Sequence, residues 1–474
     1  MKRESGKRAI NMLDGPVWNR VLQFAVPLMA TGILQQLFNA TDIAVVGRFT
    51  GEQGAAAMAA VGACSPLIGL LLNAFLGISL GTNVVIANAV GRREDQAVSK
   101  AVHTSILLAL TGGILLLALG EAGAGVILAS QNVPADVMPM AILYFRIYML
   151  GMPVILLYNF ESAIFRGVGN TRTPLIALSI SGVLNVCLNL LFVAVFHMTV
   201  DGVAIATVIS NLVSSAILFR FLLKADSAIR VKIRLLHFNV PVLKRILRIG
   251  FPAGLQSAVF SFSNIIIQSA INTLGTVVMA ASSAAFNIEI FAYYVLNSFS
   301  QACTTFVGQN YGAGKIDRCK RILWICLLEG AIATAAAVGV ILLFGHSLLA
   351  VFNTDPEVIR IGFFRLVVIF ATFIFTLSYE TMSGYMRGFG ISLLPAFLTT
   401  LGICGVRISW ILLAFPADPT FENIMKAYPA SLCATTILIF IALLVKKPAV
   451  RVRSGEKAES LNHPTDVYIE DQQN

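Results

Sequence analysis

The chain has 474 residues, of which 57% are hydrophobic and 12% are charged, and its mean hydropathy is +0.81. Soluble domains are about one-quarter charged, so this composition excludes an ordinary soluble protein. The net charge of +10 does not indicate a nucleic-acid-binding protein, because Lys and Arg gather in alternate loops between apolar runs instead of along one face.

Apolar runs of about 20 residues, each long enough to cross a bilayer as a helix, recur along the chain. The sequence predicts twelve of them, at 17–46, 55–85, 96–120, 138–163, 174–197, 203–223, 243–272, 277–307, 320–345, 358–384, 393–415 and 426–446. We therefore expect an all-α integral membrane protein with twelve transmembrane helices.

A long internal repeat divides these helices into two sets of six. The segment Phe165–Gly169 returns as Met386–Gly390, and Pro174 returns as Pro395, both 221 residues later (387 − 166 and 395 − 174). Such a repeat predicts two homologous lobes, and paired membrane halves commonly move against each other during transport. The expected organisation is an N-terminal segment (1–14), an N-lobe (15–224), a basic linker (225–242), a C-lobe (243–446) and a disordered tail (447–474).

The distribution of Lys and Arg predicts the orientation in the membrane. The termini and alternate loops hold most of these cations, whereas the opposite loops contain only Arg48, Arg360 and Lys426. This asymmetry predicts a multi-pass protein of the cell membrane whose N-terminal segment, linker and tail lie in the cytoplasm.

The predicted helix 17–46 carries a polar stripe. Gln35, Asn39 and Asp42 share one face by their spacing of four and three, and Gln36 lies beside them. A lipid-facing stripe of this kind would be expelled, so we expect Asp42 to bind a cation in a cavity and the other three side chains to line a substrate path. The alternative is a helix-end carboxylate that reaches water beside Arg48.

The predicted helices 174–197 and 203–223 add two polar pairs with a spacing of four. These are Asn185 with Asn189, and Thr207 with Asn211. Together with Asp42, their oxygens suit a hard cation such as Na⁺, or they can hydrogen-bond a protonated Asp42. The other interpretation is that these side chains form ordinary interhelical hydrogen bonds, worth roughly 1 kcal/mol each in membranes. The sequence supports the ion site and the hydrogen bonds about equally.

The predicted helix 277–307 carries a second stripe, in which Glu289, Tyr293, Asn297 and Gln301 are each four residues apart. An acid beside an aromatic ring suits an amphiphilic organic cation, through charge pairing and cation–π contact. Pairing of Glu289 with a basic residue of the opposing lobe explains the same acid equally well.

Two acids precede two arginines by one to two turns near the predicted cytoplasmic face. They are Glu161 before Arg166 and Glu380 before Arg387. We expect these four residues to form structural ion pairs at an inner gate.

Patterns typical of enzymes are weak. Gly77–Gly81 fits G-x-S-x-G, but that motif needs a strand–turn–helix elbow, and here it lies in a predicted membrane helix. Small residues at this spacing more simply allow two helices to approach closely. His and Cys residues show no metal-ligand spacing. We therefore expect no catalytic or metal centre, apart from a possible Na⁺ at Asp42, and no enzyme.

The chain resembles the multidrug and toxic compound extrusion (MATE) transporters over about residues 15–445. The resemblance rests on Pro27, Asp42–Gly47, Arg166–Pro174, Leu184–Asn189 and Val307–Gly312, in this order within a six-plus-six repeat. It implies a V-shaped pair of six-helix bundles that exports organic cations and amphiphilic drugs in exchange for H⁺ or Na⁺. It also implies that Asp42, Asn185, Asn189 and Thr207 form the cation site of the N-lobe.

Two departures from the family pattern bear on the coupling ion. Many members have Asp at the position of Asn189, so this site has one carboxylate fewer. A second branch uses an acidic pair in the C-lobe, whereas helix 243–272 has no acid here and Glu380 lies a turn after Thr376. Losing a carboxylate weakens Na⁺ binding but leaves Asp42 titratable, which favours H⁺.

Three alternatives compete with an ion-coupled exporter. A lipid-linked saccharide flippase of the same superfamily would be expected to have about fourteen spans and a cation-rich central cavity, but the predicted helices contain few cations (Arg146, Arg365 and Arg407). A membrane-embedded enzyme lacks a paired catalytic constellation. A passive channel does not require a duplication together with a buried acid. The expected partners are small-molecule drugs and the bilayer, and the expected state is a monomer.

Overall fold

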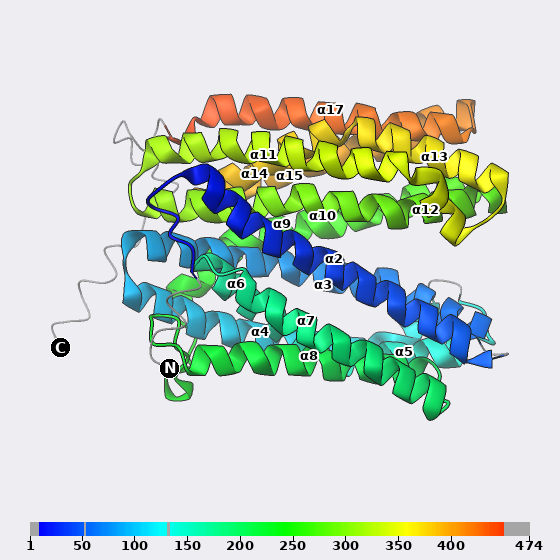
Figure 1. The fold of residues 1–474 in the computed structure, drawn as a ribbon, viewed down its shortest axis with the longest axis horizontal. Helices are drawn as coiled ribbons and strands as arrows, with labels where there is room; N and C mark the ends of the chain where they lie inside the picture. Colours follow the sequence, from blue (N-terminus) through cyan, green and yellow to red (C-terminus); the bar gives the residue numbers. More distant parts are fainter. Residues whose placement is uncertain (1–8, 52–53, 130–132, 450–474) are drawn as a thin grey trace.

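The computed structural model describes residues 9–51, 54–129 and 133–449, and every regular element within them is helical (Figure 1). In this part of the chain, ten helices are long and apolar enough to cross a membrane. Two further helix pairs, each bent at a short break, bring the number of spans to twelve. The prediction of an all-α membrane protein with twelve spans is confirmed. Residues 1–8 and residues 450–474 of the predicted tail lie outside the described residues.

The N-lobe consists of α2 to α8. Its elements are α2 (Val17–Phe49), α3 (Gly54–Arg92), α4 (Asp95–Ala129), α5 (Met138–Leu150), α6 (Met152–Gly167), α7 (Arg172–Asn189), the π-helical segment η2 (Leu190–Val195) and α8 (Val200–Leu223). Several helices are longer than the apolar runs that predicted them, because a helix continues through the polar residues at its ends. For example, α3 ends at Arg92 instead of near residue 85.

The C-lobe consists of α9 to α17, joined to the N-lobe by a linker that contains η3 (Ile233–Leu235). Its elements are α9 (Val240–Asn272), α10 (Thr276–Gly312), α11 (Ile316–Leu343), α12 (Gly345–Phe352), α13 (Pro356–Ala371), α14 (Phe373–Gly388), α15 (Leu393–Thr399), η4 (Thr400–Gly405), α16 (Val406–Ser409), η5 (Trp410–Ala414), η6 (Phe415–Ala417) and α17 (Phe421–Lys446). The short helix α12 has no counterpart among the predicted spans.

Both lobes bend at the same point of the sequence repeat. The pair α5 and α6 bends by 48° at Gly151, and the pair α13 and α14 bends by 44° at Thr372. These two breaks are 221 residues apart (372 − 151), which is the offset of the repeat. In the N-lobe, Pro153 lacks a backbone N–H and interrupts the helix. In the C-lobe, the Thr372 hydroxyl donates to the carbonyl of Ile369 at 2.7 Å and competes with the backbone there.

The two lobes meet closely from the middle of α3 and α9 to one end of the molecule. A Cβ added at Gly77 of α3 would lie 2.1 Å from the backbone N of Gly254 in α9, so the two helices touch through their backbones. The interpretation of Gly77–Gly81 as a close-packing segment is thus confirmed. Two buried hydrogen bonds also cross between the lobes: Gln309 Nε2 donates to the carbonyl of Gly167 at 2.8 Å, and Asn83 Nδ2 donates to Thr305 Oγ1 at 3.1 Å.

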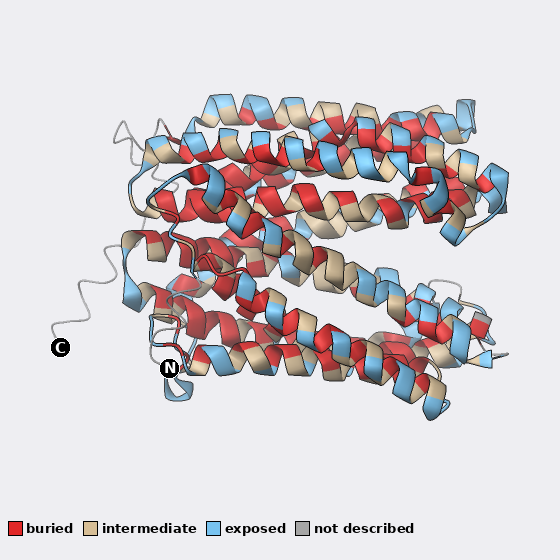
Figure 2. Cartoon of the chain, in the orientation of Figure 1, coloured by how far each residue is buried: buried red, intermediate tan, exposed pale blue. Residues whose placement is uncertain are grey.

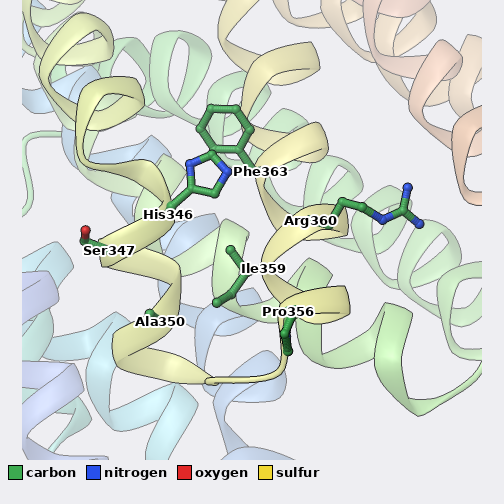
Figure 3. A pocket seen from close by; sticks show the side chains of 7 residues that line it. All are labelled: His346, Ser347, Ala350, Pro356, Ile359, Arg360 and Phe363. Atoms are coloured by element: carbon green, nitrogen blue, oxygen red, sulfur yellow. The ribbon is translucent and has the colours of Figure 1, made fainter.

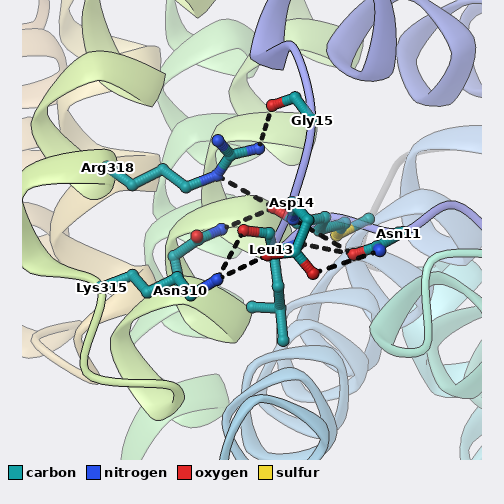
Figure 4. Close-up of polar contacts among 8 residues, drawn as sticks. Asn11, Leu13, Asp14, Gly15, Asn310, Lys315 and Arg318 are labelled. Atoms are coloured by element: carbon teal, nitrogen blue, oxygen red, sulfur yellow. Dashed lines mark hydrogen bonds and ion pairs between the residues drawn. The ribbon is translucent and has the colours of Figure 1, made fainter.

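An N-terminal strap, residues 10–15, binds both lobes at this end, which we call the strap end; Figure 4 shows its contacts with the C-lobe. The Ile10 amide donates to the carbonyl of Gly169 in the N-lobe at 3.0 Å. On the other side, Lys315 Nζ contacts Asp14 Oδ1 at 2.8 Å, and Arg318 Nη2 donates to the carbonyl of Gly15 at 2.9 Å. The strap therefore leads into α2 of the N-lobe while it is held by the first turn of α11 in the C-lobe.

The linker docks on the opposite lobe in the corresponding way. The backbone N–H of Lys232 donates to His103 Nε2 at 3.0 Å, and the backbone N–H of Asn239 donates to Thr104 Oγ1 at 3.2 Å. Both acceptors lie on α4, the N-lobe counterpart of α11. Each lead-in segment, before α2 and before α9, is therefore bound by the other lobe.

Away from the strap end, the lobes diverge toward the end that carries α5 and α12, as Figure 1 shows. Burial follows the same gradient (Figure 2). The strap-end half of α2 is buried against the C-lobe, where Phe24 meets Phe306 edge to face with ring centroids 5.7 Å apart. Between Met29 and Thr41, by contrast, only Gly32 is buried. The middle of α2 is therefore incompletely covered by protein.

Candidate functional site

Asp42 is the centre of a buried polar cluster formed by α2, α7 and α8. Asn189 Nδ2 donates to Asp42 Oδ1 at 2.5 Å, and Thr207 Oγ1 donates to Asp42 Oδ2 at 3.1 Å. Asn189 Nδ2 also lies 3.2 Å from Asn185 Oδ1. Asp42 is only 8% exposed, and both of its oxygens accept bonds from the interior of the N-lobe. It is therefore not the helix-end carboxylate beside Arg48 that the sequence left open as an alternative.

One hydrogen-bond acceptor of this cluster has no donor in the part of the chain that the structure describes. Asn189 Oδ1 is buried and has no hydrogen-bond partner among the described residues. An ionised carboxylate can only accept hydrogen bonds, whereas a protonated one can also donate. The cluster thus supplies two donors to an ionised Asp42 and keeps one oxygen for a protonated Asp42 or for a small cation. Carboxylate, amide and hydroxyl oxygens are also the ligands that a hard cation prefers.

Local structure explains how these side chains come together. Asn185 and Asn189 lie on one face of α7 because they are four residues apart, and the π-helical segment η2 begins directly after Asn189. Such segments occur frequently at functional sites because they re-aim neighbouring side chains. Asn211, the second polar residue predicted on α8, instead donates to the carbonyl of Thr207 at 2.8 Å and does not contact Asp42.

Two tyrosines near Asp42 were missed by sequence reasoning. Tyr144 and Tyr148 of α5 lie close enough to Asp42 to interact with it electrostatically, and their ring centroids are 6.1 Å apart. Their spacing of four residues was a visible signal. However, aromatic pairs at this spacing occur in many apolar helices, and only packing places this pair beside an acid.

The remaining polar residues of α2 lie outside the cluster. Gln35 and Gln36 are half-buried and Asn39 is exposed. Within the described part of the chain, none of these three side chains forms a hydrogen bond. They lie on the incompletely covered middle of α2, where they remain predicted substrate-lining residues.

The polar stripe of α10 forms a chain of hydrogen bonds that ends on the other lobe. Asn297 Nδ2 donates to the Tyr293 hydroxyl at 3.4 Å, and Gln301 Nε2 donates to Asn297 Oδ1 at 2.6 Å. Arg166 Nη1 of the N-lobe then donates to Gln301 Oε1 at 3.2 Å. The stripe therefore reaches from the interior of the C-lobe to the interface between the lobes.

Glu289, the first residue of the predicted stripe, is not a free carboxylate. It forms a two-pronged ion pair with Arg365 of α13, with N–O distances of 2.8 and 3.3 Å. Both side chains are largely buried, and Arg365 also contacts Ser282 and lies over the Tyr428 ring. The partner belongs to the same lobe, so the expectation of a basic partner in the opposing lobe was wrong.

The predicted ion pairs of Glu161 with Arg166 and of Glu380 with Arg387 do not form. Glu161 accepts a bond from Ser215 at 2.9 Å, and its other oxygen has no partner among the described residues. Arg387 interacts with Glu380 only at longer range and donates to Gln256 at 3.4 Å. Helix geometry is the reason. Residues five apart point in directions about 140° apart, and residues seven apart are separated by about 10 Å along the axis.

A cavity of about 550 Å³ lies at the far end of the C-lobe, between α12 and α13. None of the predicted site residues lines it. Figure 3 shows that His346 and Phe363 stack on one side, whereas Arg360 points away. The two rings are 4.1 Å apart, and Arg360 is paired with Glu357 at 2.6 Å. The Arg360 guanidinium is thus engaged with Glu357 and is not directed into the cavity.

Comparisons with known proteins agree with the duplicated fold. The MatE family model matches residues 27–191 and 252–413, one segment in each lobe. A probable multidrug resistance protein of Bacillus subtilis, YoeA, is 27% identical over 90% of this chain and 93% of its own length. A probable multidrug resistance protein of Thermotoga maritima, NorM, is 28% identical over 82% and 83% of the two chains. The solved structure of a MOP superfamily transporter from Pyrococcus furiosus superposes with a TM-score of 0.85 at 20% identity, over 94% of this chain and 99% of that one.

Proposed function

The chain belongs to the MatE family, the multidrug and toxic compound extrusion transporters, and from this premise we propose that it is a secondary active exporter of organic cations and amphiphilic drugs. Its relatives are named multidrug resistance proteins, and its many apolar helices make it a multi-pass membrane protein. Membership of a transporter family also agrees with the expectation that the chain is not an enzyme. The proposal adds an inward ion gradient as the driving force.

The observation that carries the coupling proposal is the buried contact of Asp42 with Asn189 and Thr207. A carboxylate at membrane depth costs roughly 2.5–3.5 kcal/mol on insertion scales, so it needs a bound proton, a cation or strong donors. Since Asn189 replaces a second carboxylate, the site has at most one negative charge, which suits H⁺ better than Na⁺. Asn185 and Thr207 complete the proposed site.

The proposed mechanism is alternating access between two lobes that rock about the strap end. Backbone contact between α3 and α9 and the divergence of the lobes at the other end support a conformation open on one side. Protonation of Asp42 would favour one arrangement of the lobes by differential affinity. The Lys and Arg distribution supports a strap end in the cytoplasm and export from the cell membrane. We propose a monomer, because each chain contains both lobes.

Efflux from proteoliposomes tests this proposal. Purified protein reconstituted with ethidium as the probe substrate should export it against a gradient when a proton gradient is imposed. A Na⁺ gradient alone should have no effect. Efflux driven by Na⁺ at constant pH would contradict proton coupling, and efflux that needs neither gradient would contradict secondary active transport.

A further inference from the structure

A second buried acid lies in the C-lobe, far from Asp42 in the sequence. Glu329 is on α11, about 20 Å along the helix axis from the first residue Ile316, and therefore near mid-span. Its side chain is only 2% exposed. Both of its carboxyl oxygens are buried and have no hydrogen-bond partner among the described residues.

The surroundings of Glu329 are apolar. A Cβ added at the adjacent Gly330 would lie 2.8 Å from a methyl carbon of Leu377 on α14 and 3.3 Å from Cβ of Phe299 on α10. Leu377 and Phe299 therefore pack on α11 directly beside Glu329, and Cys326, which shares a face of the helix with Glu329, interacts with it electrostatically. Cys326, one turn earlier on α11, interacts with Cys303 of α10. The neighbouring side chains are thus hydrocarbon and thiol groups.

Charged groups on the helices around α11 have other partners. Glu289 of α10 is paired with Arg365 of α13, and Asp42 of α2 is held by α7 and α8. Arg387 of α14 donates to Gln256 and lies near Glu380. At the far end, Arg360 of α13 is paired with Glu357, and His346 of α12 stacks on Phe363. The other buried titratable groups in this core are Cys303, Cys319, Cys326, Cys404, Tyr379 and Tyr385. Among the described residues, none of these groups bonds to Glu329.

A carboxylate without donors or a counter-ion is very costly in such an environment. It therefore has to carry a proton or bind a cation. A hard cation needs several oxygen ligands, and the neighbouring thiols and hydrocarbon supply none. We propose that Glu329 is a second protonation site, located in the C-lobe and independent of Asp42. The inference concerns proton binding alone, so it stands whether or not the chain exports drugs.

This site differs from the Asp42 cluster in how it releases its proton. Asp42 has two donors that stabilise its ionised form in place. Glu329 has none, so its ionised form requires water to reach the packing between α11, α10 and α14. Loss of the proton from Glu329 is therefore tied to a loosening of the C-lobe interior.

Infrared spectroscopy of the full-length protein in lipid nanodiscs tests the assignment. A protonated carboxylic acid has a C=O stretching band that an ionised carboxylate lacks. At neutral pH, Glu329→Gln should remove one such band from the wild-type spectrum. Asp42→Asn should leave that band in place, and Glu161→Gln, which changes the other buried N-lobe acid, should also leave it in place.

The conservative variant Glu329→Asp keeps the measurement informative if the Gln variant does not fold. It retains a carboxylic acid one methylene shorter, and we expect its band to shift in frequency without disappearing. A spectrum in which neither Glu329 variant changes any carboxylic acid band shows that Glu329 is ionised at neutral pH. That result would overturn the proposal. A band that disappears in Asp42→Asn as well would overturn the independence of the two sites.

Discussion

Arg166 of the N-lobe and Gln301 of the C-lobe are joined by a hydrogen bond of 3.2 Å across the interface between the lobes. Gln301 is also the last residue of the polar stripe on α10, where it is hydrogen-bonded through Asn297 to Tyr293 inside the C-lobe. A change in the separation of the lobes therefore stretches or breaks the hydrogen bond between Arg166 and Gln301 at one end of this stripe. In this way, the predicted substrate-lining residues are linked physically to the movement proposed for transport.

The first prediction concerns Asp42→Asn. The amide has nearly the same shape, its oxygen can still accept the bond from Asn189, and its NH2 group can donate to the Thr207 hydroxyl, but it cannot bind or release a proton. We expect normal expression, a melting temperature close to wild type and loss of gradient-driven ethidium efflux. The matched control is Asn211→Ala, since the Asn211 side chain lies on α8 but donates only to the backbone carbonyl of Thr207 and does not contact Asp42. Near wild-type efflux by Asp42→Asn against a gradient would show that Asp42 is not the coupling residue.

The second prediction concerns Glu289→Gln. The change leaves the buried Arg365 guanidinium without its counter-ion, and breaking a buried ion pair costs about 3–5 kcal/mol. We therefore expect a clear fall in melting temperature, with cationic and neutral substrates affected equally. The double variant Glu289→Gln with Arg365→Gln should recover part of this loss, because it leaves no unpaired charge. A stable Glu289→Gln protein that loses only cationic substrates would instead identify Glu289 as the drug contact.

The sequence predicted the helices well, because the lengths of the apolar runs and the 221-residue offset of the repeat can be read directly from the order of residues. The same offset recurs between the bends at Gly151 and Thr372, although neither bend was predicted, since a short break inside an apolar run leaves hydropathy unchanged. Asp42, Asn185 and Asn189 were found as polar residues with helical spacing. Thr207 was found on the same grounds, and the structure brings all four together.

The partners of single acids could not be predicted in this way. Arg365 is 76 residues from Glu289, and only the packing of α13 on α10 brings the two together. Glu329 was missed because one acid in an apolar run creates no periodic pattern. Its burial and its lack of partners become visible only when α10, α11 and α14 are assembled.

The third prediction concerns the strap and pH. The hydrogen bond from Lys315, with a smaller contribution from Asn11, holds the pKa of the exposed Asp14 carboxyl below its ordinary value of 3.8. Because this pKa is lowered by docking, the ionic contribution to docking is fully present above about pH 4 and is lost as the pH falls through the lowered value. The hydrogen-exchange rate of the Ile10 amide, corrected for the intrinsic exchange rate, should therefore stay constant between about pH 5 and 8.

Removing the charge should imitate the acidic limit. We expect Asp14→Asn and Lys315→Gln each to speed exchange of the Ile10 amide at neutral pH, and added salt to have a similar but smaller effect through screening. Glu357→Gln is the control, since it breaks another exposed ion pair at the far end of the C-lobe. If the Ile10 amide exchanges equally in all of these variants, the ion pair does not hold the strap.

The last prediction concerns the backbone contact between the lobes. A Cβ at Gly77 would lie 2.1 Å from the Gly254 backbone, closer than packed atoms can approach, so Gly77→Ala has to push α3 and α9 apart. The control is Gly62→Ala on the same helix, where no atom lies within 4 Å of the added Cβ. Gly77 lies about 22 Å along α3 from Arg92 at the strap end, so if the lobes rock about the strap end, pushing the helices apart at Gly77 should spread the lobes at the other end. Spin labels at Thr50 and Thr273, one in each lobe, should then report longer distances in Gly77→Ala than in Gly62→Ala. In otherwise wild-type protein the same distance should change with pH, and this change should be absent in Asp42→Asn. An unchanged distance distribution in Gly77→Ala, in a protein that still folds, would contradict rocking of rigid lobes even if export itself were demonstrated.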